Sequence, residues 1–157
     1  MHEKPIISIQ ELLPVSDYLR NKASSTPRTY PENYPRNLFL ENLNNSVPTL
    51  LGSGVRISNI VGNVGTSTIS SIRVVPSSIL PLWKDGYPDG FNNLSGDKGL
   101  ELGIGDETVV LASAGFINSG LNILSTTHAK LPTKSESIIY KIFTTKDSKK
   151  NIEKSQI

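Results

Sequence analysis

Turn-forming residues interrupt the middle of this chain so often that long helices are disfavoured there. The 157 residues include 12 glycines and 10 prolines, and no stretch between positions 54 and 127 exceeds ten residues without one of them. Glycine and proline break helices, and serine and asparagine compete for the backbone hydrogen bonds of a helix. The spacing therefore predicts short strands joined by tight turns.

The segments between these turns have the composition of strands. Leu100, Leu102 and Ile104 alternate with other residues, as in a half-buried strand. Glycine and asparagine at 62–65 and at 117–120 predict two hairpins. The pattern predicts a mostly β domain, an antiparallel β-sandwich or small barrel of about six or seven short strands. The expected strands are 54–61, 66–75, 100–104, 108–116, 121–127 and 136–145, the last supported best by its β-branched and aromatic content.

Both ends of the chain differ from this body. One short helix is expected near the N-terminus, either within 9–22 or, after a break at Pro14, from 16 to 23. The last residues are polar and rich in lysine, so a tail that is either disordered or a frayed helix is expected there. The prediction divides the chain into an N-terminal helix and extended arm at 1–36, a β domain at 37–145 and a basic tail at 146–157.

Within the arm, prolines at 27, 31 and 35 follow one another every four residues. This spacing forbids a regular helix and predicts an extended, polyproline-like segment. Two tyrosines stand directly before prolines, in the pairs Tyr30-Pro31 and Tyr34-Pro35. Two interpretations stay open: a stiff connector that lies on its own domain, or an arm that docks on a neighbouring subunit through these four residues.

Residues for catalysis are scarce. The chain has no cysteine and two histidines, which excludes disulfides, thiol catalysis and cysteine-based zinc sites. His2 lies at the terminus and His128 at an expected strand end. Ser113 lacks the first glycine of a nucleophile elbow, since Leu111 stands there. Carboxylates at 97, 101, 106 and 107 could pair for glycoside cleavage, but nothing selects a pair. No catalytic residue, and no enzyme activity, is predicted.

One loop gathers acidic side chains among glycines. Asp85, Asp89 and Asp97 lie in it with two asparagines, and calcium favours oxygen ligands on such loops. The helix-loop-helix calcium pattern fails, because Tyr87 stands at the third position counted from Asp85. Aspartate and asparagine also enter loops for turn chemistry alone. We favour turn formation as the reason for these residues, so no metal and no cofactor is assigned.

The partner classes follow from charge and aromatic content. The formal charge is +2, and the lysines of 146–157 are diluted by acidic residues without interleaved aromatics, so a nucleic-acid partner is not expected. No apolar run suits a membrane span of about 20 residues. Trp83, Tyr87 and Phe91 recur every four residues in one loop. Such residues can stack on a ligand or fill a partner's pocket, or they can fold down to cap one end of the expected sandwich, and both interpretations stay open.

Together these features favour a structural, non-enzymatic subunit of a larger protein assembly. The concrete example is a virion component, such as a phage tail, connector or capsid-associated protein, whose terminal arms contact neighbouring subunits in a homo- or hetero-oligomer. The alternative from another class is a carbohydrate- or peptide-binding module that uses the Trp83–Phe91 loop. A hydrolase with a dispersed site is the least favoured hypothesis.

Overall fold

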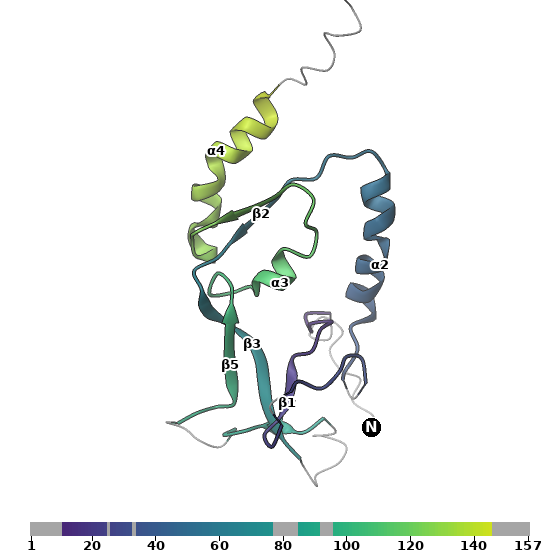
Figure 1. Cartoon of the computed structure of the whole chain (residues 1–157), viewed down its shortest axis with the longest axis vertical. Helices are drawn as coiled ribbons and strands as arrows, with labels where there is room; N and C mark the ends of the chain where they lie inside the picture. The colour runs from purple at the N-terminus through teal and green to yellow at the C-terminus, as the bar shows by residue number, and fades with distance from the viewer. Residues whose placement is uncertain (1–10, 25, 33, 77–84, 92–95, 146–157) are drawn as a thin grey trace, which may run out of the picture.

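The computed structural model describes residues 11–24, 26–32, 34–76, 85–91 and 96–145, which form two small sheets and three α-helices (Figure 1). Their content is mixed, 30% helix and 26% strand. The elements are β1 (Leu19–Asn21), α2 (Leu38–Gly52), β2 (Asn59–Gly62), β3 (Thr66–Val75), β4 (Tyr87–Pro88), β5 (Leu100–Ile104), α3 (Leu111–Ala114), β6 (Leu121–Leu124), the 3-10 turn η1 (His128–Lys130) and α4 (Leu131–Thr144).

The larger sheet is built around the long strand β3. On one side β1 runs parallel to it, with Leu19 opposite Ile72. On the other side β5 and β4 run antiparallel to it, and Ile69 lies opposite Leu102. The pairing of β3 with β5 contains two register shifts, which are local irregularities of the kind that bend a strand. This sheet brings the arm segment, the body and the acidic loop together.

The smaller sheet consists of β2 and β6, paired in parallel with Asn59 opposite Leu121. Parallel strands are usually covered on both faces, and here α4 and α3 pack against them. The side-chain amide of Asn59 donates to the carbonyls of Ala114 (2.8 Å) and Ile117 (2.9 Å). One polar side chain of β2 thus fixes the segment that follows α3.

The core of the described structure is small and lies between the arm segment and β3. It consists of Tyr18, Leu19, Tyr34 and Val74. The ring centroids of Tyr18 and Tyr34 lie 4.9 Å apart in an edge-on arrangement, which aromatic pairs favour. The Tyr34 hydroxyl accepts a hydrogen bond from the Leu19 amide (3.0 Å) and donates to the Arg28 carbonyl (2.7 Å). The proline-tyrosine segment therefore supplies part of its own chain's core.

Helix α2 starts at a buried cap. The side-chain oxygen of Asn37 accepts from the Leu40 amide (3.0 Å), the usual N-cap bond. The amide of the same side chain donates to the carbonyls of Glu11 and Leu13, both at 2.8 Å. Although Pro48 lies inside it, the helix runs for 15 residues. No residue of α2 is buried, and Figure 1 shows it standing beside the two sheets.

The predicted mostly β domain is confirmed in part: the described ranges hold about six strands in two sheets, but also three helices, and no antiparallel sandwich or small barrel is confirmed. Its content is mixed, and the sheets formed by the described ranges do not close into a barrel. The segment 136–145, predicted as the best strand, lies in α4 up to Thr144, and Thr145 is the C-cap of that helix. The inward-facing residues of this helix, Leu131, Ser135, Ile138 and Ile142, are spaced by four, three and four. A short β-branched run fits both periods, so composition alone misassigned it.

Other local predictions fail for a similar reason. The expected strands at 54–61 and 66–75 exist as β2, from Asn59 onward, and β3, but they lie in different sheets and make no hairpin. The second expected hairpin is also wrong, since residues 111–114 form helix α3 and β6 pairs with β2 instead. In the described part of the arm, residues 11–18 are turns and bends and 19–21 are β1, so no helix forms there. The strand at Leu100–Ile104 is confirmed as β5.

Candidate functional site

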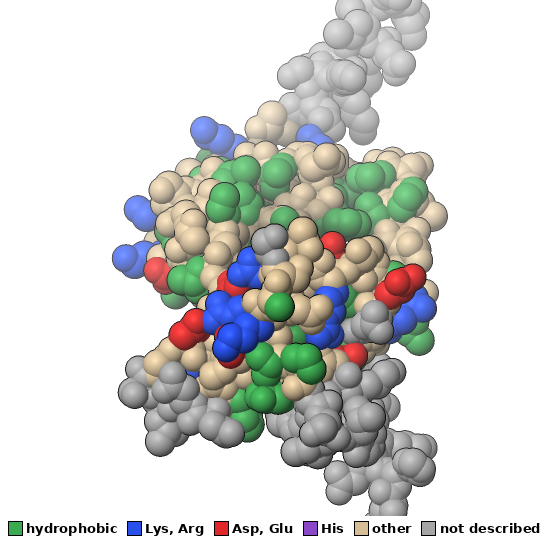
Figure 2. All heavy atoms as spheres, turned by 60° about the horizontal axis from the view of Figure 1, so that its bottom comes forward, with side chains coloured by type: hydrophobic (Ala, Val, Ile, Leu, Met, Phe, Trp, Pro, Cys, Tyr) green, Lys and Arg blue, Asp and Glu red, His purple; other side chains and the backbone are tan. Residues whose placement is uncertain are grey.

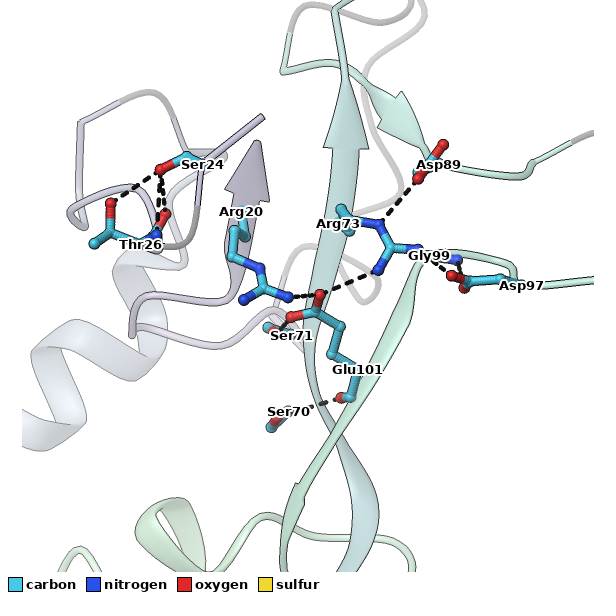
Figure 3. A network of polar contacts seen from close by, with 10 residues as sticks. All are labelled: Arg20, Ser24, Thr26, Ser70, Ser71, Arg73, Asp89, Asp97, Gly99 and Glu101. Carbon is cyan, nitrogen blue, oxygen red and sulfur yellow. Dashed lines mark hydrogen bonds and ion pairs between the residues drawn. The ribbon is translucent and has the colours of Figure 1, made fainter. Parts of the chain in front are cut away.

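A network of charged side chains covers one face of the larger sheet (Figure 3). Its centre is Glu101 on β5, which is contacted by Arg20 from β1 and by Arg73 from β3, the latter at 3.4 Å. The Ser71 hydroxyl donates to the same carboxylate at 2.8 Å. Three strands are therefore held together by one half-buried glutamate, and the β-strand alternation of sequence places all these groups on one face.

Arg73 extends this network to the acidic loop. Its Nε lies 2.9 Å from Asp89, and its guanidinium also contacts Asp97. Lys22 bonds Asp89 at 3.0 Å. Hydrogen bonds from Lys22 and Arg73 lower the pKa of Asp89, and those from the Gly99 amide and Arg73 lower the pKa of Asp97. Two of the three aspartates considered as cation ligands are thus neutralised by basic side chains of the same chain.

A buried carboxylate and a histidine form a second polar cluster. Asp106 is 2% exposed, and its Oδ1 accepts from the amides of Thr108 (3.1 Å) and Val109 (2.7 Å). Its Oδ2 lies 2.9 Å from Nδ1 of His128, and its carbonyl accepts from the His128 amide at 2.8 Å. Burial raises the pKa of Asp106, but the bonds from Val109, His128 and Thr108 outweigh it and the pKa lies below its usual value.

The arrangement of Asp106 and His128 is that of a structural clamp. It ties η1, at the start of α4, to the turn after β5. Nearly all of the hydrogen-bonding capacity of Asp106 is used for this, and no serine or threonine hydroxyl in the described ranges is hydrogen-bonded to His128. A nucleophile within reach is what a histidine base would need for acyl transfer.

Replacing Asp106 by alanine tests this clamp. We expect the free energy of unfolding at pH 7 to fall by roughly 1–3 kcal/mol, because the partly buried amides of Thr108 and Val109 lose their acceptor. A carboxyl whose pKa is lowered by folding stabilises above its unfolded pKa of about 3.9, and this stabilisation is lost as the pH falls through the folded pKa. Urea denaturation at pH 7 and pH 3 should therefore give a smaller difference between D106A and the wild type at the lower pH. An equal difference at both would contradict the ionised clamp.

The structure places the predicted arm anchors against their own chain. Tyr34 is 7% exposed in the core, with Pro35 partly buried beside it. Tyr30 is partly buried, with its ring centroid 5.4 Å from that of Tyr34 and its hydroxyl bonded to Glu41 of α2. Pro31 is exposed. These contacts agree with a connector lying on its own domain, while a role in holding a partner stays a prediction.

The predicted aromatic loop lies only partly within the described residues. Trp83 lies outside the described residues. Tyr87 is partly buried on β4, where it pairs with Val75. Phe91 is 57% exposed, and its amide donates to the Pro88 carbonyl at 3.0 Å. The structure thus places Tyr87 in the larger sheet and Phe91 at the surface.

Two open cavities lie beside α2, and Asn44 borders both. One has a volume of about 310 Å³ and is lined by Ile57, Asn59 and Phe116 among others. The other has a volume of about 300 Å³ and is lined by Val15, Tyr30, Arg36 and Glu41 among others. The charged groups in the second cavity, Arg36 and Glu41, bond each other. Neither arrangement selects a substrate chemistry.

The most unusual feature is the amount of uncovered apolar surface. Five hydrophobic residues are buried in the described part of the chain. Figure 2 shows hydrophobic side chains open in several groups around a charged centre. Large hydrophobic side chains that are 40% to 84% exposed lie on α2 (Leu38, Phe39, Leu43, Leu50, Leu51), on the larger sheet (Ile69, Leu100, Leu102, Ile104) and on α4 (Ile139, Tyr140, Phe143).

Four of these side chains share one face of the larger sheet. Ile69 lies opposite Leu102 in the register, and antiparallel partners point to the same face. Leu100 and Ile104 alternate with Leu102 along β5 and join them. All four are between 46% and 56% exposed. The polar network described above lies on the other face, with Glu101. The sheet is therefore amphipathic, with its apolar face open over β5.

Sequence reasoning found the residues of β5 but not their exposure. The alternation at 100–104 predicted one buried face, and only the fold shows that the described ranges leave its side chains about half exposed. The pair of Asp106 and His128 had no local signal at all, being 22 residues apart. The contacts of Arg73 with the acidic loop likewise depend on the pairing of β3, β4 and β5.

No protein-family model, no curated protein and no solved structure matches this chain. Among the described residues, no group of three or more histidine, aspartate or glutamate side chains is placed to hold a metal ion. None of the helices in those ranges has the length and apolar character to span a membrane.

Proposed function

We propose that this protein is a structural, non-enzymatic subunit of a larger protein assembly. The observation that carries the proposal is the open apolar face formed by Ile69, Leu100, Leu102 and Ile104 on β3 and β5. A sheet with one apolar face is stable in water when a second layer covers that face. Uncovered patches of several large apolar side chains mark interaction surfaces in soluble proteins.

The free energy that would be gained by covering this apolar face supports an assembly subunit. Each of the four side chains is about half exposed, and covering such a side chain completely contributes roughly 1 kcal/mol. Together with the open groups on α2 and α4, the surface has enough apolar material for a specific interface. Since the core holds few residues, a partner layer would also add to the stability of the fold.

The charged groups support a structural role as well. Glu101 joins three strands through Arg20, Arg73 and Ser71, and Asp106 joins a turn to α4 through His128. In each case the polar groups connect secondary-structure elements of the same chain, which is a structural role. A virion component is the concrete form that we propose; in such an assembly, repeated copies would bury these faces on one another, as symmetric oligomers do in general.

A charged substitution on the open face tests the proposal. We expect the wild-type chain to show a mass above the monomer that rises with concentration, in light scattering coupled to size exclusion. Leu102→Glu should reduce this mass because it places a charge in the centre of the contact. Asn118→Glu, an exposed loop position away from the face, should leave the mass unchanged and serves as the matched control.

The outcomes separate the candidate functions. A mass that is monomeric at every concentration for all three proteins would exclude self-assembly through this face. The alternative, a carbohydrate- or peptide-binding module built on the loop that carries Phe91, requires a well-behaved monomer. The exposure of Phe91, at 57%, is the observation that keeps this alternative in view. A monomer that binds a glycan or peptide in a screen would therefore favour it over the assembly.

A further inference from the structure

We infer that α2 is a surface on which two copies of this chain meet, helix against helix. This inference rests on the proposed function and specifies one of its contacts. It starts from the sequence of the helix. Phe39, Leu43, Val47 and Leu50 follow one another by four, four and three residues. On a helix this spacing places the four side chains in one stripe along its length.

The described residues cover the side chains of this stripe only in part. Phe39, Leu43 and Leu50 are 55%, 47% and 41% exposed, while Val47 is partly buried. On the adjacent side of the helix, Asn44 borders both open cavities. No residue of α2 is buried. A helix of 15 residues is marginal in water without a packed apolar face, so this stripe requires a further cover.

The charges of α2 favour a second copy as that cover. Glu41 is its one charged residue, and it is bonded by Arg36 and Tyr30, with the Arg36 Nε at 3.0 Å. The remaining polar side chains are asparagine, serine and threonine. Two such helices can approach each other without an unpaired charge, and the stripe is complementary to itself, as a twofold contact requires. By comparison, α4 carries Lys134, Glu136 and Lys141 beside its exposed aromatics.

The side-chain types fit helix pairing too. Leu43, Val47 and Leu50 are spaced by four and three, as in a two-helix seam, and leucine and β-branched valine are residue types that interlock there. Phe39 extends the stripe by a further spacing of four. Pro48 follows Val47 by one residue and so lies off the stripe. It does not obstruct the approach of a second helix on that side.

The area involved sets the strength of the contact. The exposed parts of Phe39, Leu43 and Leu50 are on the order of 100 Å² each. With the neighbouring atoms, a pair of α2 helices would bury less than the roughly 1,200–2,000 Å² of a standard stable interface. The α2 contact by itself therefore gives a weak dimer, which the open sheet face would reinforce in an assembly.

The absence of cysteine makes a direct test possible. A single cysteine introduced at Leu43 (L43C) reports on contact between two copies, because the chain has no other thiol. In a parallel pair, position 43 faces its own counterpart. In an antiparallel pair whose twofold axis lies level with residue 45, it faces position 47, so a mixture of L43C and V47C reports on that arrangement. Disulfides form where the Cα atoms approach to about 4.4–6.8 Å.

The expected result is faster disulfide formation than in a matched control. Asn45→Cys places the thiol at an exposed position on the opposite side of α2. At equal concentration and oxidant, L43C, alone or mixed with V47C, should form covalent dimer about tenfold faster or more than N45C, because pairing raises the effective thiol concentration. Leu43→Glu without a cysteine should lower the mass of the wild-type oligomer in light scattering.

The outcomes distinguish this inference from the proposed function. Equal rates for L43C, the L43C/V47C mixture and N45C would show that something other than a second α2 covers the stripe, and would overturn the inference. If in addition the wild type is oligomeric and only L102E changes its mass, the assembly proposal stands without the α2 contact. A wild type that is monomeric at about 100 μM and forms no covalent dimer would contradict self-association through either surface.

Discussion

Replacing Tyr34 by alanine is expected to lower the free energy of unfolding by about 3–5 kcal/mol, the usual cost of removing a buried aromatic ring. Tyr34 is 7% exposed and packs edge-on against Tyr18. Its hydroxyl also satisfies the amide of Leu19 and the carbonyl of Arg28. Small domains are stable by about 5–15 kcal/mol. The change would therefore remove a large part of the total stability.

Tyr34→Phe serves as the matched control. It keeps the ring and removes the hydroxyl, leaving the Leu19 amide in the core without its side-chain acceptor. We expect a loss of roughly 1–3 kcal/mol, between the wild type and Y34A. Urea denaturation of all three proteins, at a concentration where the wild type is monomeric, measures both. If Y34A changed only the oligomer mass and left the unfolding midpoint unchanged, Tyr34 would act on a partner and not in its own core.

This experiment also decides between the two interpretations of the proline-tyrosine segment. The sequence left them open, because prolines every four residues indicate an extended backbone and say nothing about what it lies on. The structure places β1 beside β3 and Tyr34 beneath it. Which surface an extended segment covers is a tertiary property. It depends on residues more than 30 positions away along the chain, such as Val74.

The elements that the sequence predicted are those whose local pattern is unambiguous. β3 and β5 have β-branched or leucine residues in clear alternation, and both were expected as strands. α4 was missed because its residues 138–143 are, apart from Lys141, β-branched or aromatic and suit either structure. α2 was missed because Pro48 and its asparagines argue against a helix. In the structure a buried cap at Asn37 starts this helix.

The candidate surfaces were predictable in composition but not in exposure. A half-apolar strand such as β5 implies one buried face, and the sequence does not state whether the cover comes from the same chain. The prediction of an assembly subunit came from an expected all-β body, the terminal arms and the missing catalytic groups, and the described structure has mixed α/β content instead of the first of these. The open face at Leu102 and the stripe on α2 give that proposal surfaces to which experiments can be directed.

Asn37→Ala is expected to have the second large effect, lowering the free energy of unfolding by about 2–4 kcal/mol. Asn37 is 1% exposed. Its oxygen caps α2, and its amide holds the carbonyls of Glu11 and Leu13. Loss of an N-cap costs about 1 kcal/mol, and each lost bond to a carbonyl adds roughly 0.5–1.5 kcal/mol.

Asn37→Ser separates these two contributions. Serine is a good N-cap, but it has no amide to donate to the two carbonyls. N37S should therefore be more stable than N37A by about 1 kcal/mol and still less stable than the wild type. Denaturation followed by circular dichroism measures all three. Equal stabilities of N37S and N37A would mean that the loss of stability comes entirely from the two hydrogen bonds to the carbonyls of Glu11 and Leu13, and that the N-cap bond contributes nothing.

The same pair of variants connects the fold to the α2 contact. Because no residue of α2 is buried, its order depends on its cap and on whatever covers its stripe. In an L43C background, N37A should slow covalent dimer formation, since a frayed helix presents no continuous stripe, whereas N37S should retain most of the rate. If N37A destabilised the protein but left the cross-linking rate of L43C unchanged, the thiols would be meeting without an ordered α2, and helix pairing would not be their cause.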